Sequence, residues 1–265
     1  MPLFGPICLL TAALMVAPSA PPRGVDAVPP ARPVELRFYA AASLRDVLGE
    51  LAPAIERATG TALVWNLGAS SDLARQIVAA HKADVFFSAD EAWMDQLAEA
   101  GLVDAASRRS PLSNRLVIVV PATSAARVFA PEDLAAPTVR RLSLASPAAV
   151  PAGKYAKAWL ESRGLWDALA GRVVPALDVR AALAAVESGA IDAGIVYRTD
   201  AAAARRVRVV FEVPEGEGPA ISYALAALRD RPHLELARAV VAWLCGPEAA
   251  AVFERHGFGL RAGCR

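Results

Sequence analysis

Hydrophobic and polar positions follow two alternating periods after residue 33. Residues 34–43 alternate and then become apolar, as a strand does on entering a core, and residues 44–60 continue with helical spacing and end at a glycine. The succession repeats, with strands expected at 61–70 and 83–90 and helices at 71–82 and 91–101. This strand–helix alternation predicts a parallel α/β sheet.

A continuous β-branched run at residues 115–122 divides the chain. Its composition predicts a strand that is buried on both faces. The alternation then restarts, with strands expected at 140–147, 172–179, 192–201, 206–214 and 221–228, and helices at 152–164, 180–189 and, once or twice, within 232–257.

Because the α/β pattern occurs twice, the sequence predicts two lobes of similar size. Residues 34–115 together with 221–265 are expected to form lobe I, and residues 116–220 to form lobe II. Small ligands bind beyond the carboxyl ends of such strands, in a cleft between lobes. The crossing strands, near 115–122 and 220–226, would act as the hinge.

An uncharged apolar run at residues 7–17 precedes this folded part and is too short to span a bilayer. The proline-rich segment after it is typical of a signal peptide cleaved after Ala20 or Ala27, although residues 1–6 lack the usual Lys or Arg. We predict a signal peptide at 1–27 and a soluble mature protein in the periplasm, since no other stretch is long and apolar enough to cross a membrane.

The charges are balanced, with 28 Lys and Arg against 27 Asp and Glu, which leaves no basic surface for nucleic acid or an anionic membrane. The 3 histidines are scattered and no Cys-x-x-Cys motif occurs, so no protein-bound transition metal is expected. One of the 3 cysteines lies in the predicted signal peptide. Cys245 and Cys264 either form a disulfide that pins the C-terminal tail or remain two unpaired thiols.

Several junctions between a strand and a helix carry an uncharged residue, namely Ser43, Ser70, Ala152 and Val179, and the motifs AAAS, GAS and PAG place small residues at three of them. In two facing α/β lobes these junctions would point at a shared place. Helix starts offer unpaired N–H groups and partial positive charge, and neutral donors of this kind suit a fully ionised anion rather than a protonated one. The alternatives are plain N-caps at the serines, a helix-initiating turn at Ala152 and a core role for Tyr197.

Other charged residues near these junctions have competing interpretations. Arg45 and Arg180 either tune the electric field over the cleft or solvate the surface, and we favour the surface role. Asp84, Asp90 and Asp95 could form a carboxylate cluster for acid–base chemistry or Mg²⁺, but no histidine or nucleophile accompanies them. We expect helix caps and a structural hydrogen-bond network there instead.

Seven segments of the chain occur in one order and register: AAASL, SSDLARQI, ADVFFSADEAWMDQL, LVIVVPA, VPAGKYAKAWLE, DVRAALAAVESG and GIVYRTDA. Together they resemble the periplasmic molybdate-binding proteins of ABC-type molybdate importers. The resemblance runs from about Val34 to the FERHGFGL tail and covers essentially the whole mature chain.

This resemblance implies a two-lobed class II periplasmic binding protein fold that closes on a molybdate or tungstate dianion. The implied ligand shell has hydroxyl and main-chain donors at Ser43 and Ser70, main-chain N–H donors at Ala152 and Val179, and the phenol of Tyr197. No cofactor is implied, no metal beyond the molybdenum of the oxyanion, and no catalysis. We expect a monomer that delivers its ligand to a membrane permease with a cytoplasmic ATPase.

Three other functions remain as alternatives. A binding protein of the same fold could take sulfate, phosphate or a metal cation, although cation capture needs a cluster of Tyr, His or carboxylate side chains. A hydrolase or transferase acting on an oxyanion ester would need a base near Ser43 or Ser70, and the nearest histidine, His81, lies a helix away. A sensor domain would need an attached signalling segment, and none is visible.

Overall fold

The computed structural model of the chain describes residues 1–2 and 33–262. The predicted signal peptide at 1–27 therefore lies almost entirely outside the described residues, and so does Cys264. The signal peptide and the Cys245–Cys264 disulfide both remain predictions. Residues 33–262 belong to one unit, which is described below.

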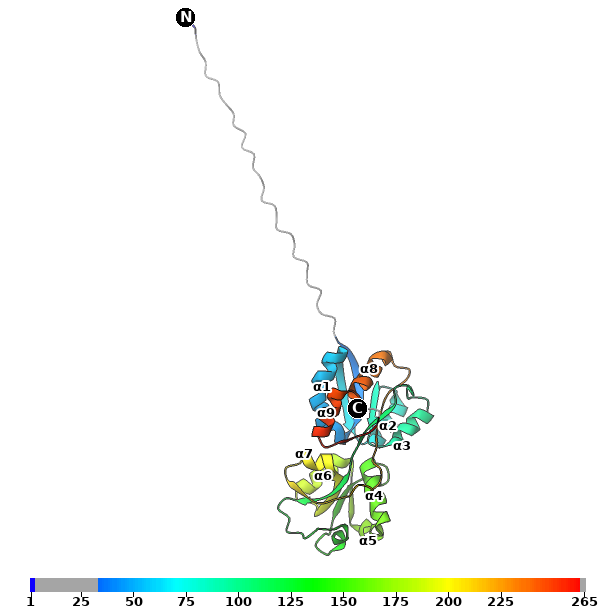
Figure 1. Ribbon diagram of the computed structural model, residues 1–265, viewed down its shortest axis with the longest axis vertical. Coiled ribbons are helices and arrows are strands. Elements are labelled where there is room, and N and C mark those ends of the chain that lie inside the picture. Colours follow the sequence, from blue (N-terminus) through cyan, green and yellow to red (C-terminus); the bar gives the residue numbers. More distant parts are fainter. Residues whose placement is uncertain (3–32, 263–265) are drawn as a thin grey trace. The chain divides into compact units, whose positions relative to one another are not determined.

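The first lobe is built on a six-stranded sheet (Figure 1). From edge to edge its strands are β11 (Gly259–Leu260), β4 (Arg109–Ser113), β10 (Tyr223–Ala227), β3 (Val85–Ser88), β1 (Val34–Ala41) and β2 (Thr61–Gly68). Strand β1 is parallel to β2 and β3, while β10 is antiparallel to β3 and β4. The expected parallel sheet is thus mixed, because β10 enters this lobe from the other one.

The second lobe is built on a five-stranded sheet. Its strands are β7 (Val173–Ala176), β6 (Leu142–Ala145), β8 (Ala193–Tyr197), β5 (Leu116–Pro121) and β9 (Val207–Glu212). Strand β6 is parallel to β7 and β8, whereas β5 is antiparallel to β8 and β9. Five of the six β5 residues are buried, as the β-branched run predicts.

Helices connect the strands in both lobes. Those of the first lobe are η1 (Ala42–Leu44), α1 (Arg45–Thr59), α2 (Ser70–Ala80), α3 (Glu91–Glu99), α8 (Leu234–Leu244) and α9 (Pro247–Arg255). Those of the second lobe are η2 (Pro131–Ala135), α4 (Pro151–Ser162), α5 (Trp166–Leu169), η3 (Ala170–Arg172), α6 (Val179–Glu187) and α7 (Arg198–Ala203).

Local chemistry explains where the first helix ends. Helix α1 buries Val47, Leu48, Leu51 and Ile55 against the sheet, which matches its helical spacing of apolar residues. It ends at Gly60, whose φ of 68° lies in the left-handed region that glycine adopts without a Cβ penalty. The expected helix end is therefore confirmed.

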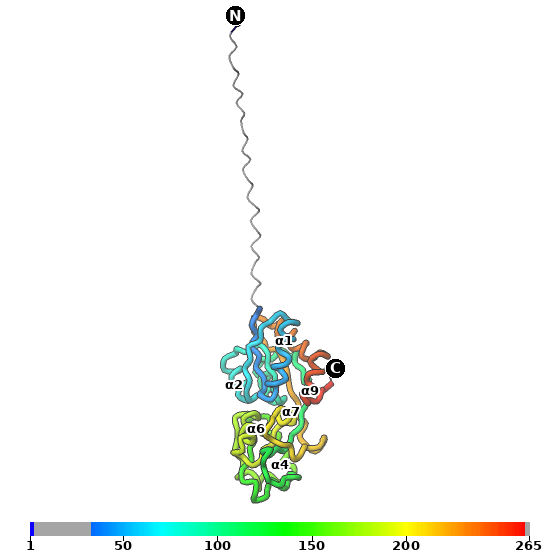
Figure 2. Tube along the Cα trace, turned by 90° about the vertical axis from the view of Figure 1, so that its left-hand side faces the viewer, coloured from blue at the N-terminus to red at the C-terminus, as the bar shows by residue number. Residues whose placement is uncertain are grey.

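The chain passes from the first sheet to the second between β4 and β5, and returns between β9 and β10 (Figure 2). These crossings, at residues 114–115 and 213–222, come just before the strands that the sequence predicts as the hinge, near 115–122 and 220–226; the hinge itself remains a prediction. Strand β4 itself was not predicted, because its sequence RSPLS is mostly polar and contains a proline. Helix α7 is also not among the predicted helices, because its first four residues belong to the strand and strand exit predicted at 192–201.

Within residues 33–262, no single helix is long and apolar enough to cross a membrane. The pair α8 and α9, bent by 56°, passes the same test by length and composition only. Residues of both helices are buried in the first lobe, including Val240, Leu244 and Phe253, and α1 packs against both helices. Core helices of this kind meet the length and composition criteria without spanning a bilayer.

Candidate functional site

A small cavity lies between the two lobes, beside the carboxyl ends of β1, β2, β3, β6, β7 and β8. The first lobe contributes Ala41, Ala42, Ser43, Gly68, Ala69, Ser70 and Ala89, and the second contributes Val150, Pro151, Ala152, Asp178, Val179 and Tyr197. All five residues predicted for the ligand shell lie on its wall. The structure thus brings together Ser43, Ser70, Ala152, Val179 and Tyr197 from both lobes; their role as ligands remains a prediction.

The size of the cavity limits what it can hold. Its volume is about 10 Å³, far below the range of roughly 300–1,000 Å³ that is typical of sites for drug-sized molecules. The residues that line it include no Lys, Arg or His side chain. A small inorganic ion held by main-chain and hydroxyl groups fits this space better than an organic metabolite does.

Ser43 lies within the 3-10 turn η1 and makes no side-chain cap. Its Oγ is 3.0 Å from the hydroxyl of Tyr223, which in turn accepts a hydrogen bond from Asn114 Nδ2 at 3.2 Å. The main-chain N–H of Arg115 donates to Asn114 Oδ1, which fixes the orientation of that amide. Either hydroxyl can donate in the Ser43–Tyr223 bond; when Tyr223 donates, the Ser43 hydroxyl keeps its own proton for an acceptor in the cavity.

Ser70 shows the same arrangement with a different partner. It is the first residue of α2, the N-cap is Ala69, and no side chain caps the helix. The Ser70 Oγ accepts a hydrogen bond from the main-chain N–H of Ala89 at 2.9 Å. Its proton is therefore also available to an acceptor. The plain N-cap interpretation is wrong for both serines, because neither hydroxyl bonds to its own helix start.

Ala152 is the second residue of α4, where a main-chain N–H has no partner within the helix. The following Gly153 allows this helix start to lie directly on the end of β6. A Cβ at position 153 would stand 2.0 Å from the carbonyl oxygen of Ala145. The glycine therefore serves the approach of α4 to its own sheet, and this approach positions the Ala152 N–H at the cavity.

Val179 is the first residue of α6, so its N–H is also without a partner inside the helix. The preceding Asp178 is the N-cap, and its carboxylate accepts a hydrogen bond from the N–H of Ala181 at 2.8 Å. That carboxylate lies next to the cavity. Its use as a cap leaves the Val179 N–H for an anion.

Tyr197 ends β8 and is 1% exposed. Its hydroxyl has no hydrogen-bond partner among the described residues. Burial raises the pKa of Tyr197 well above its usual value, so the side chain remains a neutral O–H donor at physiological pH. A buried donor of this kind is stabilised by an acceptor in the cavity.

The two arginines near the cleft behave differently. Arg45 is exposed, in agreement with a surface role. Arg180 is not a surface residue: its guanidinium forms ion pairs with Asp46 and with the fully buried Asp200. The surface interpretation of Arg180 is therefore wrong, because the sequence does not reveal its two distant partners.

The three aspartates of the first lobe have structural partners. Asp84 accepts hydrogen bonds from the main chain of Arg37 and the guanidinium of Arg231. Asp90 caps α3, and Asp95 pairs with Arg108. No group of metal-binding side chains is found among the described residues. Caps and a structural network are therefore the better interpretation, as expected.

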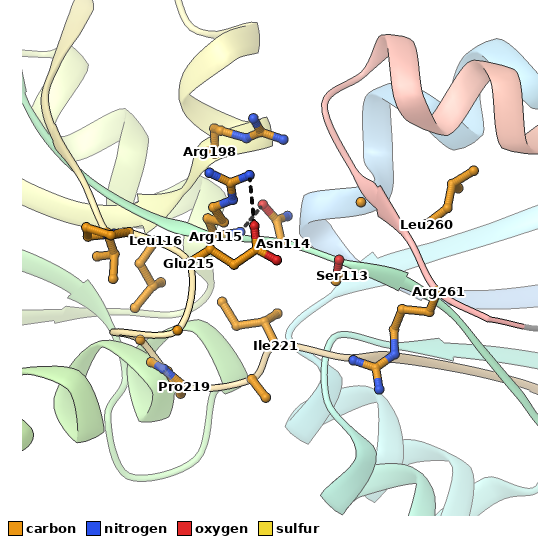
Figure 3. Close-up of a pocket in the computed structure, with 16 residues that line it drawn as sticks. Ser113, Asn114, Arg115, Leu116, Arg198, Glu215, Pro219, Ile221, Leu260 and Arg261 are labelled. Carbon is orange, nitrogen blue, oxygen red and sulfur yellow. Dashed lines mark hydrogen bonds and ion pairs between the residues drawn. The ribbon is translucent and has the colours of Figure 1, made fainter.

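A larger pocket lies at the crossing strands (Figure 3). Its wall includes Asn114, Arg115, Arg198, Glu215 and Arg261. Arg115 pairs with Glu215 at 3.8 Å, so part of its charge is already balanced. The predicted site residues do not line this pocket, and we assign the candidate site to the smaller cavity.

Sequence reasoning missed the residues that support the site. Tyr223 lies in a predicted strand and Asn114 just before one, and neither carries a local motif. Their partners, Ser43 and Thr199, are 180 and 85 residues away in the chain. Only the folded structure brings such groups together.

Known proteins of similar sequence are solute-binding proteins. A family model described as bacterial extracellular solute-binding protein matches residues 36–259. The molybdate-binding protein ModA of Escherichia coli is 37% identical over 231 residues, which cover 86% of this chain and 90% of that protein.

Solved structures are similar as well. The periplasmic molybdate-binding protein of Azotobacter vinelandii has a TM-score of 0.76 and 27% identity, over 85% of this chain and 99% of that one. The sulfate-binding protein SubI of Mycobacterium tuberculosis has a TM-score of 0.74 over 86% of this chain and 88% of that one, but its 20% identity supports the fold alone. The chain described here belongs to the bacterial extracellular solute-binding protein family and folds as its two-lobed members do.

Proposed function

We propose that this protein binds the molybdate dianion in the cavity between its lobes. The observation that carries the proposal is the arrangement of five neutral donor positions from both lobes around one small cavity. The relatives named as molybdate-binding proteins support the choice of ion. Tungstate has nearly the same size and the same charge, so we expect it to bind as well.

Each donor has a separate part in the proposed shell. Ser43 and Ser70 donate through their hydroxyl and main-chain N–H groups, Ala152 and Val179 donate through main-chain N–H groups, and Tyr197 donates through its phenol. Two helix starts add positive potential from the second lobe. Since every group is a donor, a ligand that carries its own O–H would place that proton against another donor.

The lobes supply the proposed binding motion. We propose that residues 34–115 and 221–265 form lobe I and that residues 116–220 form lobe II, a division that the two separate sheets support. The lobes would rotate about the crossing segments and close on the anion. The closed form is then stabilised because donors from both lobes share one ligand.

Size is the proposed basis of discrimination against sulfate. The S–O bond is shorter than the Mo–O bond, so a shell fixed for molybdate would hold sulfate with stretched hydrogen bonds. Each hydrogen bond to a charged group contributes about 1.5–3 kcal/mol, or on the order of 10- to 100-fold in affinity. Binding of sulfate instead of molybdate is the alternative, and the experiment below distinguishes the two.

The proposed role is transport without catalysis. The Ser43 hydroxyl is hydrogen-bonded to the Tyr223 hydroxyl and the Ser70 hydroxyl accepts from the Ala89 main chain, and neither partner is a base that could activate a nucleophile. We propose that the mature protein works in the periplasm as a monomer. It would deliver its ligand to the membrane permease of an ABC importer, whose cytoplasmic ATPase drives release.

A thermal-shift panel with molybdate, tungstate, sulfate and phosphate tests this function. Molybdate at about one hundred times its dissociation constant should stabilise the protein by roughly 2.7 kcal/mol. Tungstate should act similarly, and sulfate and phosphate should raise the melting temperature little at the same concentration. If sulfate or phosphate alone raised it, the proposed ligand would be wrong.

A further inference from the structure

Arg180 connects three elements that carry the candidate donors. It follows Val179 in the first turn of α6. Its Nε lies 2.6 Å from Oδ1 of Asp200 in α7, the helix that begins directly after Tyr197. Its terminal nitrogen forms an ion pair and a hydrogen bond with Asp46 of α1, three residues after Ser43.

Only one of these two ion pairs spans the cleft. Arg180 and Asp200 both belong to the second lobe, whereas Asp46 belongs to the first. The Arg180 side chain is 22% exposed and the Asp46 side chain is 42% exposed. The Arg180–Asp46 pair therefore joins the two lobes close to the cavity and is partly shielded from solvent. Neither residue lines the cavity itself.

We propose that the Arg180–Asp46 ion pair is a clasp that holds the lobes together and slows release of the bound oxyanion. Arg180 is thus a positioning residue, which acts on the ligand through the closed arrangement of the lobes and not by contact. This inference rests on the proposed function, because it assumes that the cavity between the lobes is the binding site.

The buried Asp200 makes the clasp effective. It is fully buried and its Oδ1 lies 2.6 Å from the guanidinium within the second lobe, so Arg180 has a partner that does not depend on contact between the lobes. An ordinary surface ion pair contributes little because two long side chains must be ordered to form it. Here the arginine has a partner in its own lobe, and the short Asp46 side chain is the one that has to be fixed.

The direction in which Asp46→Asn changes the affinity for molybdate distinguishes this clasp from a simple charge effect. Asp46 is an acidic residue close to a site proposed for a dianion, so its charge alone would repel the ligand. Asp46→Asn should therefore tighten binding if only that charge matters. It should weaken binding if the ion pair holds the lobes together.

Asp72 provides the matched control. It lies in the first turn of α2, two residues after Ser70, and its side chain is 49% exposed. Its ion-pair partner is Arg75 of the same helix, so the pair does not span the cleft. Asp72→Asn removes one negative charge from the same lobe as Asp46, close to Ser70, and leaves the Arg180–Asp46 pair in place.

The experiment measures the molybdate dissociation constant by calorimetry and the dissociation rate by stopped flow for the wild type, Asp46→Asn and Asp72→Asn. We expect Asp46→Asn to raise both quantities by roughly twofold to fivefold. Asp72→Asn should leave them unchanged or lower them slightly. The melting temperature of ligand-free Asp46→Asn should equal that of the wild type, since Asp46 is an exposed residue of α1.

The outcomes are distinct. If Asp46→Asn leaves binding unchanged or tightens it as Asp72→Asn does, the clasp is refuted while the molybdate site stands. If a loss of affinity in Asp46→Asn comes with an equal loss of ligand-free stability, Asp46 is structural and the clasp is also refuted. If the wild type itself does not bind molybdate, the proposed function is wrong, independently of the clasp.

Discussion

Replacing Tyr197 by phenylalanine removes one oxygen from the wall of the cavity and little else. The ring would keep its packing against Tyr223, whose centroid lies 5.9 Å away. The lost hydroxyl has no partner among the described residues, so no hydrogen bond within that part of the protein is broken. The substitution therefore separates ligand binding from stability.

The magnitude follows from the state of this hydroxyl. It is buried and its pKa is raised by that burial, so it stays protonated and can donate to an anion. A hydrogen bond to a charged partner contributes about 1.5–3 kcal/mol. Its loss should weaken molybdate binding by roughly 10- to 150-fold. The ligand-free protein should be as stable as the wild type, or slightly more so, because a buried hydroxyl without a protein partner is removed.

Two measurements on the wild type and Tyr197→Phe test these expectations. Calorimetric titration with molybdate measures the affinity, and thermal melting without ligand measures the stability. The expected pattern is a large loss of affinity with an unchanged or higher melting temperature. An affinity within twofold of the wild type would refute the role of this phenol in the shell. A fall in ligand-free stability as large as the fall in binding free energy would mean that the hydroxyl is a structural group.

Three further predictions address other parts of the site. Ser43→Ala should weaken molybdate binding about tenfold or more in calorimetry, because it removes a hydroxyl donor, and unchanged affinity would contradict the shell. Val179→Pro should weaken binding by a similar factor, since it deletes a main-chain N–H at the first helical position, where proline is tolerated; a stable variant with wild-type affinity would exclude this donor. Burial raises the pKa of Asp200 to about 7, so the folded state binds one proton more than the unfolded state between about pH 4 and pH 7. The contribution of Asp200 to the free energy of unfolding should then be greatest below pH 4. It should fall as the pH rises toward 7, by at most about 1.4 kcal/mol per pH unit. Denaturation at several pH values should show this slope in the wild type and not in Asp200→Asn, and equal slopes would contradict it.

The fold could be predicted wherever local chemistry decides the structure. The apolar spacing and the terminal glycine of α1, and the β-branched run of β5, each gave an element close to its observed bounds. Strand β4 could not be found in this way, because its pairing with β10 and β11 depends on segments far along the chain. A polar strand that contains Pro111 has no periodic signal of its own.

Four of the five donor positions, Ser43, Ser70, Ala152 and Val179, could be picked out in the sequence as neutral residues at junctions between a strand and a helix, and the family resemblance added Tyr197. The residue pattern alone left a plain cap as an alternative for Ser43 and Ser70. Their orientation is fixed by Tyr223 and the Ala89 main chain, and that choice depends on tertiary contacts. The same is true of Arg180, whose partner Asp46 lies 134 residues away.

The central claim is that uncharged N–H and O–H groups from both lobes surround one doubly negative tetrahedral ion. Anomalous diffraction at the molybdenum edge, from crystals of the mature protein grown with molybdate, tests it most directly. We predict a single strong molybdenum peak in the cavity, with oxyanion atoms within hydrogen-bond distance of Ser43, Ser70, Ala152, Val179 and Tyr197. A peak elsewhere, such as in the larger pocket at the crossing strands, or an ion held chiefly by arginine side chains, would contradict it.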